Sequence, residues 1–322
     1  MASEVTVVIP TRNRRPLLMR ALHSVLTQRA VDLAVVVVDD GGTDGTGAAV
    51  DGLGDERVTC LALPASGGVS AARNAGLDLA RSDWVAFLDD DDLWAPDKLR
   101  SQLDALAADG SAGWSSTGVL EVDERCRILA WDLPVPEHDV GDGLLSWNVV
   151  PGPGSSLVVS RRLALDVGGF DEALPGLEDW DFCIRLGLAA EVVPVQRAQV
   201  GYLIHRSSRA HDIDRGRAAF AAIEAKYAEE RMRRGVRMDR TFWNNYLGSL
   251  AYRSGRPWLG SRLKLGPLVR YRRPGTLLEI MAGMSSIDLT GRAVRRARAK
   301  APAELRAEAE SWLAPYRYGR FE

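Results

Sequence analysis

Short apolar runs and longer amphipathic stretches take turns along the first part of the chain. Apolar runs without polar alternation are typical of parallel strands that are covered on both faces. Four such runs predict strands: Val5–Pro10, Ala34–Asp39, Val58–Leu63 and Trp84–Leu88. The stretches between them carry apolar residues at helical spacing, which predicts helices at residues 15–29 and 70–80.

Alternating strands and helices favour a doubly wound α/β fold with a parallel sheet. In such sheets, ligands bind beyond the carboxyl ends of the strands. Three polar clusters follow the predicted strands here, at Thr11–Arg15, Asp39–Thr46 and Asp89–Asp92. We therefore expect these three loops to converge on one crevice.

The regular alternation stops near residue 110. Strands are predicted at Trp114–Val122 and Ser155–Ser160, within a stretch rich in Gly, Pro and Trp that we interpret as a mixed-sheet half. From residue 209 the composition shifts to Ala, Arg and Glu. Helical patterns lie there at residues 213–233, 241–253 and 302–313. We expect a catalytic domain over residues 1–208 and a helical C-terminal extension over residues 209–322.

The charge balance of the 322-residue chain is close to neutral, with 41 Lys and Arg against 43 Asp and Glu. No global field would recruit nucleic acid, so local clusters must provide any electrostatic function. The three cysteines are far apart and lack CxxC spacing, which favours a reducing compartment.

The N-terminus shows no secretion signal, and no stretch approaches the roughly 20 apolar residues that cross a bilayer. We expect a cytoplasmic protein, with any membrane contact peripheral and at the inner membrane surface. Residues 258–273 mix basic and aromatic side chains. This segment is either an interfacial anchor or, because Gly260, Gly266 and Pro267 interrupt a helix, a segment packed on the catalytic domain.

Four consecutive carboxylates, Asp89–Asp92, follow the strand that ends at Leu88. Like charges this close repel one another, and a divalent cation such as Mn²⁺ or Mg²⁺ removes the repulsion. The alternative is a solvated acidic turn in which Asp92 or Asp97 caps the following helix.

A second acidic cluster, Glu178–Asp181, begins an apolar helical run. Acidic residues commonly complement the dipole in a first helical turn. A glycine-rich approach at residues 168–176 could instead present one carboxylate to a cleft as a general base.

The order of these motifs resembles family-two glycosyltransferases, which have an A-type fold. The resemblance covers residues 4–208 and rests on the following segments: VIPTRN at residues 8–13, VDDGGTDGT at 38–46, GVSAARNAG at 68–76, Asp89–Asp92 with Pro96 and Leu99, GGFD at 168–171 and EDWD at 178–181. It implies a Rossmann-like, mixed and mostly parallel sheet flanked by helices. It also implies an inverting glycosyltransferase that uses a nucleotide-diphosphate sugar, with a UDP- or dTDP-sugar favoured, and an acceptor that the sequence leaves open.

The resemblance also implies roles for individual residues on the donor side. Pro10, Thr11 and Asn13 would line the nucleotide site, and Asp40 would accept a hydrogen bond from the N3–H of a uracil or thymine ring. Asp39 would contact ribose or simply end its strand. A further nucleotide-facing position falls on Arg73, whose guanidinium suits a diphosphate.

On the reaction side, Asp89 and Asp90 would bind the donor and Asp91 would bind the metal, with the register along the four acids open by one residue. His205, or His211 if the register slips, would help to bind metal or diphosphate. Asp179 would be the general base and Glu178 its support. Trp180 would either stack on a sugar or anchor its helix.

Two other functions remain open at this stage. A metal-dependent sugar nucleotidyltransferase would also use a Rossmann-like sheet and carboxylate-bound metal, although the loop at Thr11–Arg15 lacks the Gly-rich character that such enzymes need. A non-catalytic sugar-nucleotide-binding protein would keep nucleotide affinity without turnover.

Overall fold

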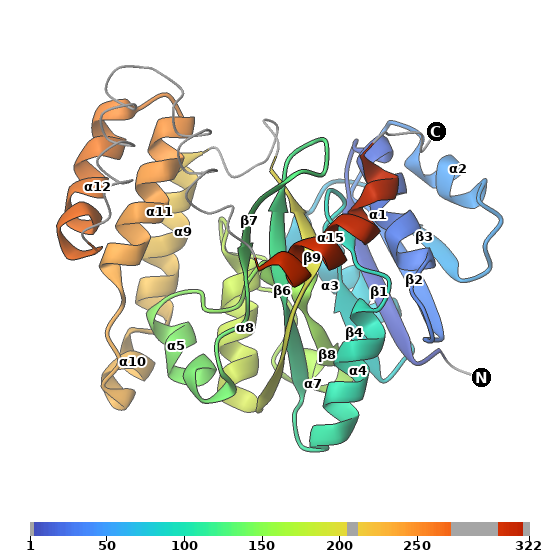
Figure 1. Ribbon diagram of the computed structural model, residues 1–322, viewed down its shortest axis with the longest axis horizontal. Helices are drawn as coiled ribbons and strands as arrows, with labels where there is room; N and C mark the ends of the chain where they lie inside the picture. Colours follow the sequence, from blue (N-terminus) through green and yellow to red (C-terminus); the bar gives the residue numbers. More distant parts are fainter. Residues whose placement is uncertain (1–2, 205–211, 272–301, 318–322) are drawn as a thin grey trace.

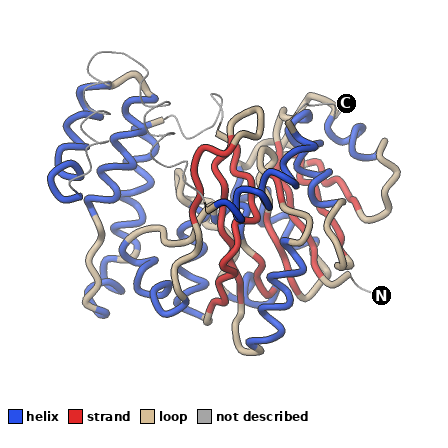
Figure 2. The backbone as a smooth tube through the Cα atoms, viewed as in Figure 1, coloured by secondary structure: helices blue, strands red, loops and turns tan. Residues whose placement is uncertain are grey.

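The computed structural model describes residues 3–204, 212–271 and 302–317. One mixed sheet with helices on both sides forms the centre of the molecule, and further helices stand at one end (Figures 1 and 2). The strands follow the order β3-β2-β1-β4-β8-β6-β9-β5, and β7 pairs with β6. The expected α/β class, with a helical C-terminal region, is confirmed.

The first four strands are parallel, as predicted. The elements of this half are β1 (Val5–Thr11), α1 (Arg15–Leu26), β2 (Leu33–Asp39), α2 (Thr46–Asp51), β3 (Val58–Ala62), α3 (Val69–Leu79) and β4 (Trp84–Phe87). Every residue of β1 is buried. Val7 and Ile9 pack in a cluster with helix α1, whereas Val8 packs in a second cluster with α3. Two covered faces explain why the run is continuously apolar.

The second half of the sheet is mixed, with parallel β6 and β9 and antiparallel β4–β8, β5–β9, β6–β8 and β6–β7 pairs. Its elements are β5 (Leu93–Trp94), α4 (Lys98–Asp109), β6 (Trp114–Val122), β7 (Ile128–Asp132), η1 (Glu137–Asp139), α5 (Val140–Ser146), α6 (Pro153–Ser156), β8 (Val158–Ser160), α7 (Arg161–Asp166), α8 (Glu178–Ala189) and β9 (Val192–Leu203). The strand expected at Ser155–Ser160 is shorter than predicted because Pro153 begins a helical turn.

The C-terminal elements are helical, as expected. They are α9 (Ile213–Lys226), α10 (Ala228–Arg234), α11 (Arg240–Arg253), α12 (Pro257–Tyr271), α15 (Ala303–Leu313) and η2 (Ala314–Tyr316). The single helix expected at residues 213–233 is divided at Tyr227. Residues 257–271 form a helix although Pro267 lies inside it, so the expectation that glycine and proline interrupt this segment was wrong.

The C-terminal helices share cores with the sheet half of the molecule. Ile223, Tyr227 and Trp243 belong to the buried cluster that contains Trp180. Asp181 at the start of α8 forms ion pairs with Arg185 and Lys226, of which the latter ends α9. The domain division near residue 208 stays a prediction, since residues 205–211 lie outside the described ranges. Among the helices described, none combines the length and apolar character needed to cross a bilayer.

Candidate active site

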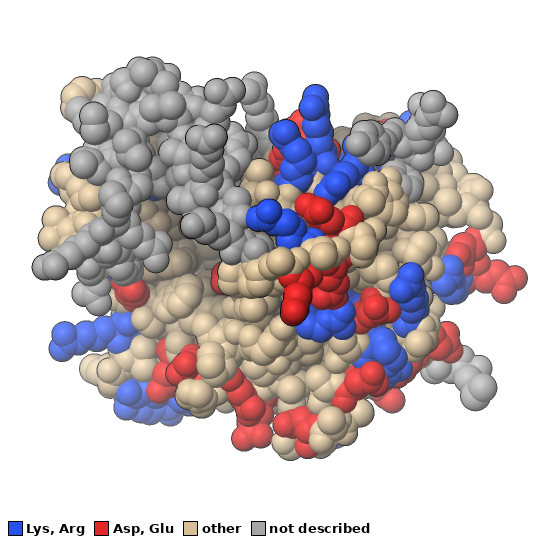
Figure 3. All heavy atoms as spheres, in the orientation of Figure 1, with Lys and Arg blue, Asp and Glu red and all other residues tan. Residues whose placement is uncertain are grey.

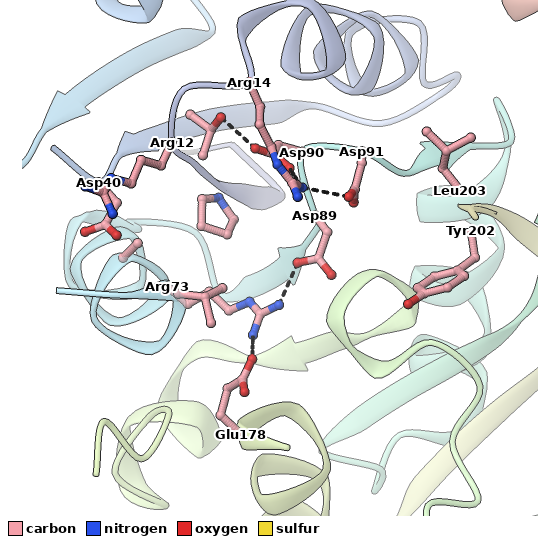
Figure 4. A pocket seen from close by; sticks show the side chains of 14 residues that line it. Arg12, Arg14, Asp40, Arg73, Asp89, Asp90, Asp91, Glu178, Tyr202 and Leu203 are labelled. Atoms are coloured by element: carbon pink, nitrogen blue, oxygen red, sulfur yellow. Dashed lines mark hydrogen bonds and ion pairs between the residues drawn. The ribbon is translucent and has the colours of Figure 1, made fainter. Parts of the chain in front are cut away.

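A cleft opens where the carboxyl ends of β1 and β4 meet the first turns of α3 and α8 (Figure 4). Val8 of β1 lies in register with Phe87 of β4, so the loops that follow these strands emerge side by side. The cleft is lined by Pro10, Thr11, Arg12, Arg14, Asp40, Val69, Ala72, Arg73, Asp89, Asp90, Asp91, Glu178, Tyr202 and Leu203. The three polar loops therefore converge, as the sequence predicts.

The loop after β1 holds the middle of the acidic run. Thr11 Oγ1 donates a hydrogen bond to Asp90 Oδ2 at 2.7 Å. Arg14 Nη1 bridges two carboxylates, with Asp90 Oδ1 at 3.1 Å and Asp91 Oδ2 at 2.8 Å. Burial and the neighbouring charge of Asp91 raise the pKa of Asp90 to about 6. The acidic run therefore concentrates negative charge, which Arg14 from the loop after β1 offsets in part.

Asp92 points away from the cleft. Its carboxylate accepts hydrogen bonds from Ser155 Oγ at 2.6 Å and from the Leu203 amide at 3.0 Å, and only 1% of the residue is exposed. Asp97 precedes helix α4 but makes no side-chain cap. The acidic run is therefore neither a solvated turn nor a helix cap, and its first three residues face the cleft.

Arg73 connects the acidic loop, which is the run Asp89–Asp92, to helix α8. Its guanidinium donates to Asp89 Oδ1 at 2.6 Å and to Glu178 Oε1 at 3.0 Å, as Figure 4 shows. The residue is 2% exposed, and its Cζ lies 5.0 Å from the Phe170 ring centroid. Burial opposes the charge of Arg73, but the carboxylates around it raise its pKa above the ordinary arginine value. The permanent cation fixes the distance between the two acidic clusters.

The turn before α8 is fixed by Asn74 of α3. Its Oδ1 accepts from the Phe170 amide at 2.7 Å, and its Nδ2 donates to the Phe170 carbonyl at 2.9 Å. Gly169 has a φ of +64° and approaches Asn74 so closely that a Cβ would lie 2.5 Å from Oδ1. The glycine pair of the GGFD segment therefore allows α8 to begin beside α3.

Asp179 is a half-buried carboxyl in the first turn of α8. Its Oδ1 accepts a hydrogen bond from its own helix, at the Trp180 amide 2.7 Å away. Burial, together with the neighbouring charge of Glu178, raises the pKa of Asp179 to about 7. A carboxyl with that pKa takes up a proton readily at neutral pH, which suits a general base.

Trp180 is an anchor of α8. It is fully buried, its Nε1 donates to the Leu144 carbonyl at 2.9 Å, and its ring lies 4.5 Å from that of Trp243. The alternative of stacking on a sugar is therefore wrong.

Asp40 lines the cleft and closes the loop that precedes α3. Its carboxylate accepts from Ser66 Oγ at 2.7 Å and from the amides of Gly67 and Gly68 at 2.7 and 3.0 Å. An ionised carboxylate has about four lone-pair positions, so these bonds leave capacity for one further donor.

Asn13, Asp39 and Asp179 are not among the cleft-lining residues, although Glu178, the neighbour of Asp179, is. Asn13 adopts a φ of +55°, and its Oδ1 accepts from the Thr43 amide at 2.7 Å, which ties the first loop to the second. Asp39 accepts from the Gly42 amide at 2.9 Å and ends its strand. His205 and His211 lie outside the described residues.

Three cleft residues carry chemistry that the sequence reasoning did not single out: Arg12, Arg14 and Tyr202. The arginines stand in a basic run, Arg12-Asn13-Arg14-Arg15, and the opposite charge of the acidic run was the available signal. Tyr202 gives no such signal because only the pairing of β9 with β6 and β5 brings it there. Burial and the nearby carboxylates raise the pKa of Tyr202 well above its usual value.

The acidic loop fits a hard divalent cation. Side chains of Asp89 and Asp91 are 30% and 17% exposed and present oxygen atoms along the cleft. Within the described ranges, no three His, Cys, Asp or Glu side chains converge into a complete site. Mg²⁺ and similar ions commonly use one or two carboxylates and take their other ligands from water and substrate phosphates. This donor set therefore suits a cation that binds together with a diphosphate.

Two family models match the chain over most of the region just described. The model for Glycosyl transferase family 2 matches residues 6–125, and the model for Glycosyltransferase like family 2 matches residues 142–235. The first match contains the acidic loop and Arg73, and the second contains Glu178 and Asp179.

Two similar proteins are named for roles in biosynthesis. The succinoglycan biosynthesis protein ExoO of Rhizobium meliloti is 31% identical over 263 residues, which are 74% of this chain and 75% of ExoO. The putative teichuronic acid biosynthesis glycosyltransferase TuaG of Bacillus subtilis is 38% identical over 148 residues, which are 45% of this chain and 58% of TuaG.

Solved structures share the fold. S. aureus TarS, solved in complex with UDP-GlcNAc, has a TM-score of 0.52 at 18% identity over 88% of this chain and 90% of that one. The mannosyltransferase PcManGT from Pyrobaculum calidifontis, solved with GDP-Man and Mn²⁺, has a TM-score of 0.57 at 20% identity over 99% of this chain and 88% of that one.

Proposed function

The chain belongs to glycosyltransferase family 2, and on that premise we propose that it moves a sugar from a nucleoside diphosphate to an acceptor nucleophile with inversion at the anomeric carbon. The observation that carries this proposal is the Asp179 carboxyl. Its pKa of about 7 lets it remove a proton at neutral pH. It stands beside Glu178, and Arg73 connects Glu178 to the acidic loop.

The donor is proposed to be a uridine or deoxythymidine diphosphate sugar. An N3–H donor on the base can use the remaining lone-pair capacity of Asp40. Arg12 and Arg14 border the same cleft and suit a diphosphate. The hydrogen bond from Thr11 to Asp90 joins the loop that carries these arginines to the loop that carries the four aspartates.

Asp91 is the proposed protein ligand of Mn²⁺ or Mg²⁺, because its carboxylate faces the cleft. When bound, the cation supplies electrostatic stabilisation of the charge that grows on the leaving diphosphate. Arg73 keeps Asp89 and Glu178 apart at a fixed spacing. Asp179 would take the proton of the acceptor nucleophile as that nucleophile bonds to the anomeric carbon and the bond from this carbon to the diphosphate breaks.

The donor class is tested by thermal shift of the purified protein with nucleoside diphosphates and their sugars, each with and without Mn²⁺. We expect a metal-dependent rise in Tm with one uridine or deoxythymidine diphosphate. A rise only with triphosphates would favour a nucleotidyltransferase. Donor binding by the natural chain without any product would favour a sugar-nucleotide-binding protein.

The metal role is tested separately with Asp91→Ala in titration calorimetry. We expect Mn²⁺ to strengthen donor binding in the natural chain and to have little effect in this variant. Asp142→Ala is a matched control, because this exposed aspartate lies outside the cleft. Equal donor affinity with and without Mn²⁺ in the natural chain would contradict the proposed metal role.

A further inference from the structure

Helix α12 presents an apolar face to the outside of the molecule. Trp258, Leu265 and Val269 are 74%, 54% and 77% exposed, and Arg262 is exposed between them. Their spacing of four, three and four residues places these side chains on one side of a helix. We call Trp258, Arg262, Leu265 and Val269 the outer face of α12.

The opposite side of α12 is already occupied by α11, and the two helices stand side by side at the end of the molecule away from β3 (Figure 1). Leu259 and Leu263 pack against the buried cluster of Leu247 and Leu250. Gly260 approaches α11 so closely that a Cβ would lie 2.9 Å from the Gly248 carbonyl. A helix that is apolar on both sides is normally covered on both sides, and within the described ranges the outer face of α12 stays exposed.

The charge of this region indicates the chemistry of the occupant. Residues 240–278 contain eight Lys and Arg and no Asp or Glu, whereas the chain as a whole is nearly balanced. Over the central sheet region that Figure 3 draws in colour, positive and negative side chains are interspersed. Of the eight cations, Arg240 and Arg256 pair with Glu224 and Asp214, and Lys264 is buried, whereas Arg262 is exposed on the outer face. A partner that combines an apolar layer with negative charge fits this segment.

We propose that the outer face of α12 docks on a membrane surface that contains anionic lipids. Trp258 would lie at the headgroup level, Leu265 and Val269 would enter the acyl boundary, and Arg262 would contact lipid phosphates. A second copy of the chain fits less well. A two-fold contact brings the same surface of both copies together, which would place the acid-free, basic segments against each other.

The test is sedimentation of the 322-residue chain with vesicles of phosphatidylcholine alone or mixed with phosphatidylglycerol. We expect binding to the anionic vesicles, weaker binding at high salt, and little binding to phosphatidylcholine. Trp258→Ser and Arg262→Glu are each expected to lower the anionic-vesicle affinity by about tenfold. Because both side chains are exposed, the variants should keep their circular dichroism and their Tm.

Matched controls come from exposed residues elsewhere. Met232 on α10 is 78% exposed, and the Arg162 side chain on α7 is 91% exposed. Met232→Ser and Arg162→Glu are expected to bind vesicles like the natural chain. Equal binding to both vesicle types, or equal losses in the controls, would overturn the proposal.

Light scattering provides a second decisive outcome. A concentration-dependent dimer that Trp258→Ser abolishes would assign the outer face to a second copy and overturn membrane docking. The donor-induced thermal shift is independent of these variants, so a failure of the membrane proposal is distinguishable from a failure of the proposed transferase activity.

Discussion

Asparagine at position 179 is expected to make the protein more stable and less active. The pKa of Asp179 rises from its ordinary 3.8 to about 7, because of burial and the charge of Glu178. About three pKa units correspond to about 4 kcal/mol of unfavourable ionisation, and partial solvent access reduces this to about 2 kcal/mol. Asp179→Asn removes that charge and keeps a side-chain oxygen that can accept the hydrogen bond from the Trp180 amide.

The sign of the effect fixes its pH dependence. A raised folded pKa means that the ionised side chain destabilises the folded state above about pH 7, and that this penalty disappears as the pH falls toward 4. We expect Asp179→Asn to raise Tm by about 4 °C at pH 8 and to bring no gain near pH 4. In the natural chain, kcat/KM should rise with pH up to about 7 and then level, because the base must be ionised.

The assay combines differential scanning fluorimetry at pH 4 to 8 with turnover of the donor that thermal shift identifies. Asp179→Asn is expected to lower kcat by roughly 10² to 10⁴ while donor binding at pH 8 stays near that of the natural chain. Asp171→Asn is the control, because Lys226 holds the pKa of that carboxyl below its usual value. Undiminished turnover, or a lower Tm at pH 8, would refute the reasoning for Asp179.

Two further substitutions test the acidic loop. In Gly154→Ala the new Cβ would lie 2.5 Å from Asp89 Oδ2; we expect a fall in kcat/KM of about tenfold or more, which corresponds to about 1.4 kcal/mol of transition-state stabilisation. Steady-state kinetics should show no such fall for Gly141→Ala, whose Cβ would meet nothing within 4 Å. Arg14→Gln removes a cation 2.8 Å from Asp91; calorimetry should show tighter binding of Mn²⁺ alone and weaker binding of the donor, and unchanged affinities would contradict this competition.

The N-terminal half of the fold was predictable because its strands are short local runs, of which β1, β2 and β4 are largely buried and only the edge strand β3 is partly exposed. Val5–Thr11 and Leu33–Asp39 differ by one residue at an end from the predicted strands. The later half depends on tertiary contacts. Ser155 is part of helix α6, where its hydroxyl binds Asp92 and its carbonyl accepts from Trp94 Nε1, and no periodicity reports such contacts.

The candidate site was predictable where one motif supplies a residue and less so where two distant loops meet. Asp89, Asp91 and Glu178 line the cleft, whereas Asp179, to which the resemblance gives the role of base, is not among the lining residues. The bridge from Arg14 to the acidic loop depends on the register of β1 against β4 and is invisible in either loop alone. Tyr202 likewise enters the cleft only through the pairing of β9.

Helix α15 supports the candidate site from far along the chain. Trp312 and Leu313 pack with Leu93, which follows the acidic loop, and with Leu203, which lines the cleft. A nascent chain whose strands have all left the ribosome therefore still lacks the packing of Trp312 and Leu313 on Leu93 and Leu203 until residue 313 has also left it. We expect that a chain ending before Ala303, which lacks α15, binds and consumes donor poorly even though it contains every strand of the sheet.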